Sequence, residues 1–451
     1  MATATKVVFL ILCFALVCNY VDANPRIRPE SGPDIYKGKN VAKDTLAPGE
    51  KVVNVVSLGA KGDGKFDCTQ AFMDGWQATC KSKEQARLLI PPGTFLVSSM
   101  FFSGPCLTPG PVTIQVVGTV LATTDISEYE NSEWLMFQHI EGLKLLGGGT
   151  FDGQGQDSWE HNQNCEADPT DQCVRAPSNI VFLKMQNLYF DRVTNGVVQN
   201  IKSVNPKGFH IFVTNSGNMR LRLIKINAPA TSPNTDGIHI SHSINVKISR
   251  TSIETGDDCV SMIQGVNNVT IKRLKCGPGH GLSIGSLGKY QDELPVNGIR
   301  VQATTLVGTT NGLRIKSWPD KYTGSASDIH FIGITMENVK NPIIIDQEYE
   351  CDPECKKKVC VFIFLFLLYT NYYFSTSMQP SLVKINNIGF INIKGTTISP
   401  IAVDLRCSKQ FPCKDVQLRN IDLKLGTNPT TSRCANIKPI YSGIQIPPPC
   451  P

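Results

Sequence analysis

The chain has 451 residues, of which 41% are hydrophobic and 18% are charged, and its formal net charge is +6. This length and composition allow a large core in one domain, and solenoid folds reach this size as single units. The positive balance suits an acidic partner, but so small an excess more often only keeps a protein in solution. Charge therefore gives no reason to expect a nucleic-acid partner.

The N-terminus has the pattern of a secretory signal. Lys6 precedes the apolar run Val7–Cys18, and the small residues up to Ala23 suit cleavage there. The run is too short for a comfortable membrane span, and a buried first strand is the alternative reading. We expect residues 1–23 to be a signal peptide and residues 24–50 a flexible leader or pro-segment, so that the mature protein is secreted and extracellular with no membrane partner.

Sixteen cysteines in a secreted chain predict disulfides. Cys13 and Cys18 leave with the signal, and close spacing suggests six pairs among the others, although sequence does not fix connectivity. The suggested pairs are Cys80–Cys106, Cys165–Cys173, Cys259–Cys276, Cys351–Cys355, Cys407–Cys413 and Cys434–Cys450. Cys68 and Cys360 are left over.

A short helix is expected near the start of the folded region, which we place at residues 51–451. Phe72, Trp76 and Cys80 lie four residues apart within Thr69–Cys80, a spacing typical of an amphipathic helix. Such a helix would cover the open end of a solenoid, whose bare strands would otherwise invite aggregation.

From Arg87 onward, short β-branched runs alternate with Gly, Asn and Asp. One type of run begins with Asn or Asp: Asn218-Met-Arg-Leu, Asn245-Val-Lys-Ile, Asn268-Val-Thr-Ile, Asp328-Ile-His-Phe and Asp415-Val-Gln-Leu. A second type lies between these: Gly237-Ile-His-Ile, Cys259-Val-Ser-Met, Gly281-Leu-Ser-Ile and Gly312-Leu-Arg-Ile. Two strand types per coil predict an all-β parallel β-helix, because a β-sandwich would show hairpin turns. Asn268-Val269-Thr270 is also a glycosylation sequon.

One segment breaks this pattern. Val359–Phe374 is almost wholly apolar and uncharged, but it is short for a membrane span and further coils follow it. We hypothesise that Val359–Gln379 is a retained intron, because its ends can be encoded by splice-like GTATGT and CAG and because its removal joins Lys358 to Pro380 in frame. A real loop that faces lipid or a partner is the alternative.

Three polar clusters in the middle of the chain are separated by the same number of residues. Asp236 and Asp258 are 22 residues apart, and so are Asp258 and His280. Equal phase in a solenoid stacks residues of successive coils about 4.8 Å apart, so these side chains, with Asp257, would converge on one face. Each cluster alone reads as a turn, but three in register favour a site. Repulsion among the carboxylates should raise at least one pKa, which suits acid/base hydrolysis.

Two cations follow on a later strand. Arg314 and Lys316 flank Ile315, so both point outward and Ile315 points inward. They would either neutralise the carboxylates or hold an anionic substrate, since Arg grips a carboxylate with two hydrogen bonds and Lys acts as a point charge.

Four motifs in this order carry a resemblance. The sequences NTDGIHI, TGDDCVS, GPGHGLSIGSLG and NGLRIKSW resemble the signatures of polygalacturonases in glycoside hydrolase family 28, in its plant, exo-acting branch. The similarity covers Val52 to Cys450 apart from the apolar insertion. It implies a right-handed parallel β-helix that hydrolyses α-1,4 bonds between galacturonates of pectate, with inversion and without a metal or other cofactor. We expect a monomer that acts on this polyanionic polysaccharide in the cell wall.

The resemblance also implies roles for single residues. Asp257 would protonate the leaving oxygen, Asp236 and Asp258 would activate water, and His280 would orient or tune the acid. Substrate carboxylates would be bound by Asn234, Arg314 and Lys316, and Tyr349 would contact substrate. Inverting enzymes hold their carboxyls about 6.5–9.5 Å apart, whereas adjacent coils predict about 5 Å, so the expected inversion rests on the resemblance.

Several alternatives remain open at this point. The same fold could act on rhamnogalacturonan, or could be a pectate lyase that needs calcium and a basic proton abstractor. A wall-binding protein without turnover would lack a carboxylate of the cluster, and all three are present. His239 and His242 could be surface residues beside the site, and His210 core or rim. Of the four tryptophans (Trp76, Trp134, Trp159 and Trp318), we expect packing roles for all except Trp318, a candidate sugar platform.

Overall fold

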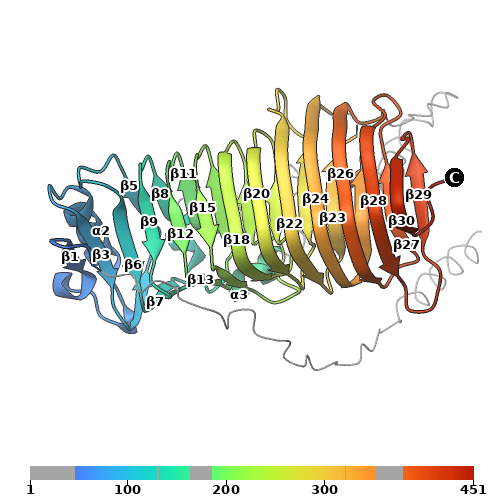
Figure 1. Ribbon diagram of the computed structural model, residues 1–451. Coiled ribbons are helices and arrows are strands. Elements are labelled where there is room, and N and C mark those ends of the chain that lie inside the picture. The colour runs from blue at the N-terminus through green and yellow to red at the C-terminus, as the bar shows by residue number, and fades with distance from the viewer. Residues whose placement is uncertain (1–45, 130–131, 163–184, 320, 351–378) are drawn as a thin grey trace, which may run out of the picture. The chain divides into compact units, whose positions relative to one another are not determined.

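Two kinds of parallel strand alternate along the chain and form a parallel β-helix, with strands that follow one another in chain order (Figure 1). The computed structural model describes residues 46–129, 132–162, 185–319, 321–350 and 379–451, and only the backbone of residues 160–162. The expected signal peptide, residues 24–45 of the expected leader and residues 359–378 of the insertion lie outside the described residues. So do Cys360 and the suggested pairs Cys165–Cys173 and Cys351–Cys355.

One sheet has 11 strands, each paired in parallel with the strand of the next coil. They are β5 (Met100–Ser103), β8 (Glu133–Gln138), β11 (Gln186–Asp191), β14 (Ile211–Thr214), β17 (Ile238–Ile240), β19 (Val260–Met262), β21 (Leu282–Leu287), β23 (Asn311–Ser317), β25 (Asn341–Asp346), β27 (Ile401–Arg406) and β29 (Thr431–Ala435).

The other sheet has 19 strands. They are β1 (Lys51–Asn54), β2 (Asp63–Asp67), β3 (Ala86–Ile90), β4 (Thr94–Val97), β6 (Val112–Val116), β7 (Thr119–Ala122), β9 (Leu143–Leu146), β10 (Thr150–Asp152), β12 (Val197–Gln199), β13 (Lys202–Val204), β15 (Arg220–Arg222), β16 (Lys225–Asn227), β18 (Ile244–Glu254), β20 (Asn267–Cys276), β22 (Val296–Val307), β24 (Gly324–Val339), β26 (Val383–Thr397), β28 (Lys414–Lys424) and β30 (Ile440–Ile446). β15 and β16 both pair with β18, so two short strands of earlier coils continue as one long strand in later coils.

The core follows from the alternation of buried and exposed residues along each strand. Side chains of one register position stack from coil to coil, as Phe102, Phe137 and Phe190 do with ring centroids 4.7 and 4.9 Å apart. Phe331 and Phe390 repeat the contact further along at 5.4 Å. Because each coil buries the face of its neighbour, the stack forms one continuous apolar core.

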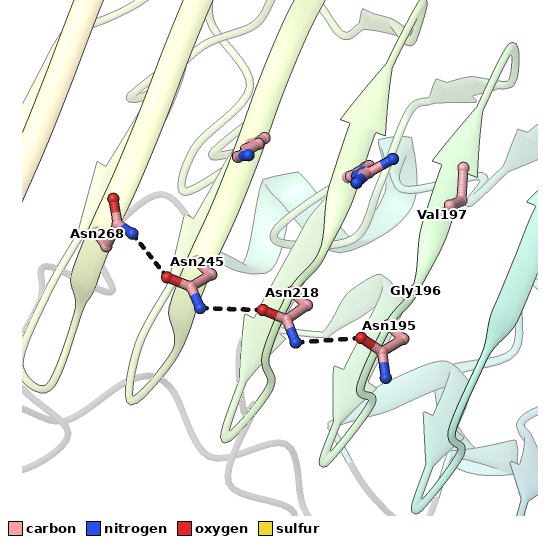
Figure 2. Close-up of a pocket in the computed structure, with 8 residues that line it drawn as sticks. Asn195, Gly196, Val197, Asn218, Asn245 and Asn268 are labelled. Atoms are coloured by element: carbon pink, nitrogen blue, oxygen red, sulfur yellow. Dashed lines mark hydrogen bonds between the residues drawn. The ribbon is translucent and has the colours of Figure 1, made fainter.

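Asparagines form one corner of the coils. Asn195, Asn218, Asn245 and Asn268 begin or precede strands of the 19-stranded sheet and have φ between 54° and 59°, in the left-handed region that Asn tolerates better than most residues. The amide Nδ2 of each donates to Oδ1 of the one before, at 3.1, 3.0 and 2.7 Å (Figure 2). The Asn that starts each run in the sequence is therefore a corner residue in a hydrogen-bonded ladder.

The expected capping helix is confirmed. Helix α2 spans Thr69–Cys80 and buries Phe72, Trp76 and Cys80 against the first strands of the solenoid. Its Gly75 allows close packing on β3, because a Cβ there would lie 2.7 Å from Leu88 Cδ1 and the leucine side chain would have to shift. The other helical segments of the described residues are short: η1 (Val55–Leu58), η2 (Ile126–Glu128) and α3 (Gln156–Asn162). None of the helices within the described ranges is long and apolar enough to cross a membrane.

Four of the suggested disulfides are present: Cys80–Cys106, Cys259–Cys276, Cys407–Cys413 and Cys434–Cys450. Cys68 is free and buried, as its exclusion from the pairing scheme predicted. Three tryptophans also pack as expected: Trp76, Trp134 and Trp159 are buried and donate from Nε1 to backbone carbonyls of Ser103, Val97 and Pro206.

Candidate active site

The predicted vertical alignment of the acidic cluster is confirmed. Ile238 pairs with Val260 and Val260 pairs with Leu282, so the register advances by 22 residues per coil at this point. Asp236, Asp258 and His280 each stand two residues before these positions, at the entry to β17, β19 and β21. Their coils are joined by amide bonds: Gly237 N donates to Asp258 O at 2.9 Å, and Cys259 N donates to Gly281 O at 2.8 Å.

Asp258 is the most heavily bonded carboxylate of the cluster. Its side chain is 2% exposed. Oδ1 accepts from Ser283 Oγ at 2.7 Å and from the Arg314 guanidinium at 2.9 Å, and Oδ2 accepts from Lys316 Nζ at 3.1 Å. The two cations therefore contact Asp258 directly, the first of the two uses that the sequence left open. Pairing on both sides makes a buried carboxylate tolerable.

Asp257 pairs with His280. Its Oδ1 lies 3.0 Å from His280 Nδ1 and accepts from the Asp258 amide at 2.7 Å. Burial opposes ionisation of Asp257, but the hydrogen bond and charge of His280, the charge of Lys316 and the Asp258 amide outweigh it and hold the pKa well below its usual value. The raised carboxyl pKa expected from repulsion is therefore not found at Asp257, where His280 and Lys316 favour the ionised form. The same hydrogen bond raises the pKa of His280, against the effect of burial.

Asp236 contacts two side chains, Ser261 and His239, to which the sequence analysis gave no role at this carboxylate. Ser261 Oγ donates to Asp236 Oδ2 at 2.6 Å. His239 Nδ1 lies 2.6 Å from the same Ser261 Oγ and 3.4 Å from Asp236 Oδ2. Since the serine proton is used on Asp236, the His239 tautomer that satisfies both contacts carries its proton on Nδ1.

A signal for these partners was present in the repeats. His239, Ser261, Ser283 and Arg314 are register partners on successive strands of the 11-stranded sheet. Each is the third residue of its Gly- or Cys-headed run, so equal phase alone places them in one row beside the carboxylates. His239 also stacks on Phe209, with ring centroids 4.6 Å apart. The fully buried His210, by contrast, bonds Ser203 in the core, and burial lowers its pKa to about 3.

Tyr349 and Trp318 lie next to the two cations. Lys316 Nζ is 4.9 Å and the Arg314 guanidinium carbon 5.9 Å from the Tyr349 ring centroid. Tyr349 meets Trp318 edge to face at 5.5 Å, and burial raises the pKa of its phenol. Trp318 is 8% exposed, so it packs beneath Tyr349 and presents no open face to a sugar. Asn234 is half-buried, two residues before Asp236, with a φ of 54°.

The donor atoms of Asp257, Asp258 and His280 all lie within 4.8 Å of one another, close enough to share a metal ion. Protein groups already engage them: Arg314 and Lys316 contact Asp258, and His280 contacts Asp257. Two cations beside this donor set make it a poor site for a divalent cation, because a metal would have to displace or be repelled by them.

Carboxyl groups set beside an imidazole on one face of a solenoid suit glycoside hydrolysis, and the chain belongs to the glycosyl hydrolases family 28. The family model matches residues 80–364 and 363–444. The chain is 43% identical to a polygalacturonase of Gossypium hirsutum, over 88% of this chain and 89% of that protein. It is 40% identical to an exopolygalacturonase of Platanus acerifolia, over 88% and 97% of the two chains.

Solved structures share the fold. An endo-xylogalacturonan hydrolase of Aspergillus tubingensis superposes with a TM-score of 0.68 at 23% identity, over 87% of this chain and all of that one. An exopolygalacturonase of Thermotoga maritima gives 0.66 at 19% identity, over 87% and 92% of the two chains. Together with the two parallel sheets, these likenesses confirm the all-β, right-handed parallel β-helix expected from the sequence.

Proposed function

We propose that this chain is an exo-acting polygalacturonase that hydrolyses the α-1,4 bonds of pectate. The observation that carries the proposal is the stacking of Asp236, Asp257 and Asp258 at the entry to consecutive strands, next to His280 and Lys316. The family supplies the reaction class, and relatives named polygalacturonase and exopolygalacturonase supply the substrate and the exo action.

In the proposed mechanism, the Asp257–His280 pair supplies the proton. Below the raised pKa of His280 the pair holds one proton on the imidazole. This proton moves by way of Asp257 to the leaving glycosidic oxygen as the bond to the anomeric carbon breaks. Asp236 and Asp258 orient a water molecule and accept its proton as its oxygen bonds to that carbon. The product anomer is inverted, as the family resemblance implies.

The cations have a second use in this mechanism. Arg314 has N–H donors beyond the two that contact Asp258 and Ser283. We propose that Arg314, Lys316 and Asn234 hold the carboxylates of the galacturonates at the scissile bond, with Tyr349 against a sugar ring. The network on Asp258 fixes both cations before substrate arrives, so little side-chain entropy is lost on binding.

We further propose that the enzyme is a secreted monomer of the cell wall. The four disulfides of the described residues suit an oxidising compartment. The apolar N-terminal run and the small residues before Ala23 suit an export signal. N-terminal sequencing of the protein from culture medium checks this: the first residue should be Asn24.

Analysis of the products tests the proposed reaction. Purified protein is incubated with pectate in excess chelator, and products are sized from the earliest times. Exo hydrolysis predicts galacturonate monomer from the outset and no ultraviolet-absorbing unsaturated ends. An early ladder of oligomers would replace exo action with endo action. Absorbing ends that vanish in chelator would identify a lyase and overturn the proposal.

A further inference from the structure

A strongly cationic face lies on the 19-stranded sheet, away from the strand entries that carry the acidic cluster. Strands β12 to β20 of this sheet contain nine Lys or Arg residues: one in β13, two in β15, one in β16, two in β18 and three in β20. The same strands contain a single carboxylate, Glu254. Eight of the nine cations are exposed on the outer face of their strands or at a corner, so the charge faces solvent.

Some of these cations lie directly opposite one another on adjacent coils. Arg220 pairs in register with Lys247, and Lys202 pairs with Lys225, in adjacent strands about 4.8 Å apart. Like charges directly opposite each other destabilise a sheet. Among the described residues, no ion pair with an acidic side chain relieves Arg220, Lys247 or Lys272. The opposed pair Arg220 and Lys247 therefore lowers the free energy of unfolding, and an external anion would offset this cost.

A hollow of about 450 Å³ opens on this face. Its lining combines the guanidinium of Arg220 and the ammonium of Lys247 with the four amides of the asparagine ladder, which Figure 2 shows in one line. A primary amide has two N–H donors and the ladder uses at most one of them, so each amide can also donate to a hydroxyl or a carboxylate. Cations can pair with the carboxylates of acidic sugars, and the amides can hydrogen-bond to their hydroxyls.

We propose that this cationic face binds a second stretch of polygalacturonate and holds the enzyme on its polymeric substrate. A linear chain of carboxylated sugars complements cations carried by successive coils, and it offers hydroxyls to the ladder. The occupant follows from the substrate class proposed above, but the binding site is separate from the catalytic residues. Only a long polymer can occupy both, so the face would act through avidity on pectate and be without effect on short oligomers.

The test removes three charges from the face. Arg220→Gln, Lys247→Gln and Lys272→Gln are combined, and the control combines Lys340→Gln, Lys394→Gln and Lys414→Gln, three exposed cations beyond β20. All proteins carry Thr270→Ala, which removes the sequon so that no glycan on Asn268 covers the hollow. Retention on immobilised pectate is measured in an Asp257→Asn background across a salt series, and turnover of trigalacturonate is measured with Asp257 intact.

The face variant should bind pectate roughly 5–50-fold more weakly at low salt, with a shallower salt dependence. The control variant should bind pectate like the parent. The parent, the face variant and the control variant should turn over trigalacturonate at equal rates. Equal weakening in the control, or undiminished retention in the face variant, would overturn the proposal. So would equally tight, face-dependent binding of dextran sulfate or of anionic lipid vesicles, which would reveal a general polyanion surface. Loss of trigalacturonate turnover in the parent would instead count against the proposed function.

Discussion

At the scale of single residues, each carboxylate of the cluster has its own set of hydrogen-bond partners. These partners differ in charge and in whether they can give up a proton. Asp258 is held by Arg314 and Lys316, while Asp257 shares a hydrogen bond with His280. Asp257 is therefore the carboxyl to which we assign proton exchange with a neighbour. A low pKa alone would disqualify it as a general acid, but His280 Nδ1 lies 3.0 Å from its Oδ1, so the two groups can share a proton.

This pairing predicts the pH dependence of the reaction. Asp257 raises the pKa of His280 above its usual 6.5, so the pair keeps its proton at pH values where free histidine is neutral. The alkaline limb of kcat/KM should therefore fall at a pH above 6.5, and NMR titration should give His280 a lower pKa in Asp257→Asn than in the parent. An alkaline limb at or below 6.5, or an unchanged His280 titration, would contradict the shared-proton model.

The serines beside the carboxylates allow a matched comparison. Ser261→Ala removes the hydroxyl donor of Asp236, whereas Ser283→Ala leaves Asp258 its two cations. A hydrogen bond to a charged group contributes about 1.5–3 kcal/mol, so kcat should fall roughly 10-fold or more in Ser261→Ala and less in Ser283→Ala. Steady-state kinetics on trigalacturonate measure both, and the reverse ranking would remove Ser261 from the positioning of Asp236.

At the scale of elements, the corner of each coil is fixed by one residue type. Asn245 accepts a hydrogen bond from Asn268, donates one to Asn218, and has a φ of 59°. The sequence showed the recurring Asn at the head of each run, but periodicity alone did not reveal the ladder. A hydrogen bond between side chains of successive coils becomes evident only once the register is known.

Asn245→Ala should therefore lower the free energy of unfolding by about 1–3 kcal/mol, from two lost hydrogen bonds and a left-handed backbone that alanine disfavours. Asn245→Gly is the matched control, because glycine adopts positive φ without strain and loses only the bonds. Urea denaturation should rank the parent above the glycine variant and the alanine variant last. Equal stability of all three would show that the ladder is solvated and without net effect.

At the scale of the whole chain, sequence reasoning predicted the architecture because one stride recurs. The 22-residue spacing fixed which side chains stack, and α2, four disulfides and the free Cys68 followed from local spacing. The direction of the pKa shift in the cluster was harder to predict. The lowered pKa of Asp257 depends on where His280 and Lys316 lie in three dimensions. The roles of Ser261 and His239 as partners of Asp236 were not predicted, because they become evident only from the register between β17 and β19.

The apolar insertion can be tested at this scale as well. β24 pairs directly with β26, and the two matches of the family model meet at residues 363–364, inside Val359–Gln379. We propose that the coils need nothing from this segment. A variant that lacks it should be secreted in equal or higher yield with unchanged kcat on pectate, and transcripts should include spliced reads without it. Failure of the shortened protein to fold would show that the segment belongs to the solenoid.

The most direct test of the central claim is the turnover of Asp257→Asn on pectate. General acid catalysis contributes about 10²–10⁴-fold, so kcat should fall by that factor while KM changes little and the circular dichroism spectrum stays that of the parent. A folded Asp257→Asn protein that turns over pectate at the parent rate would contradict the assignment of the stacked cluster as the hydrolytic site.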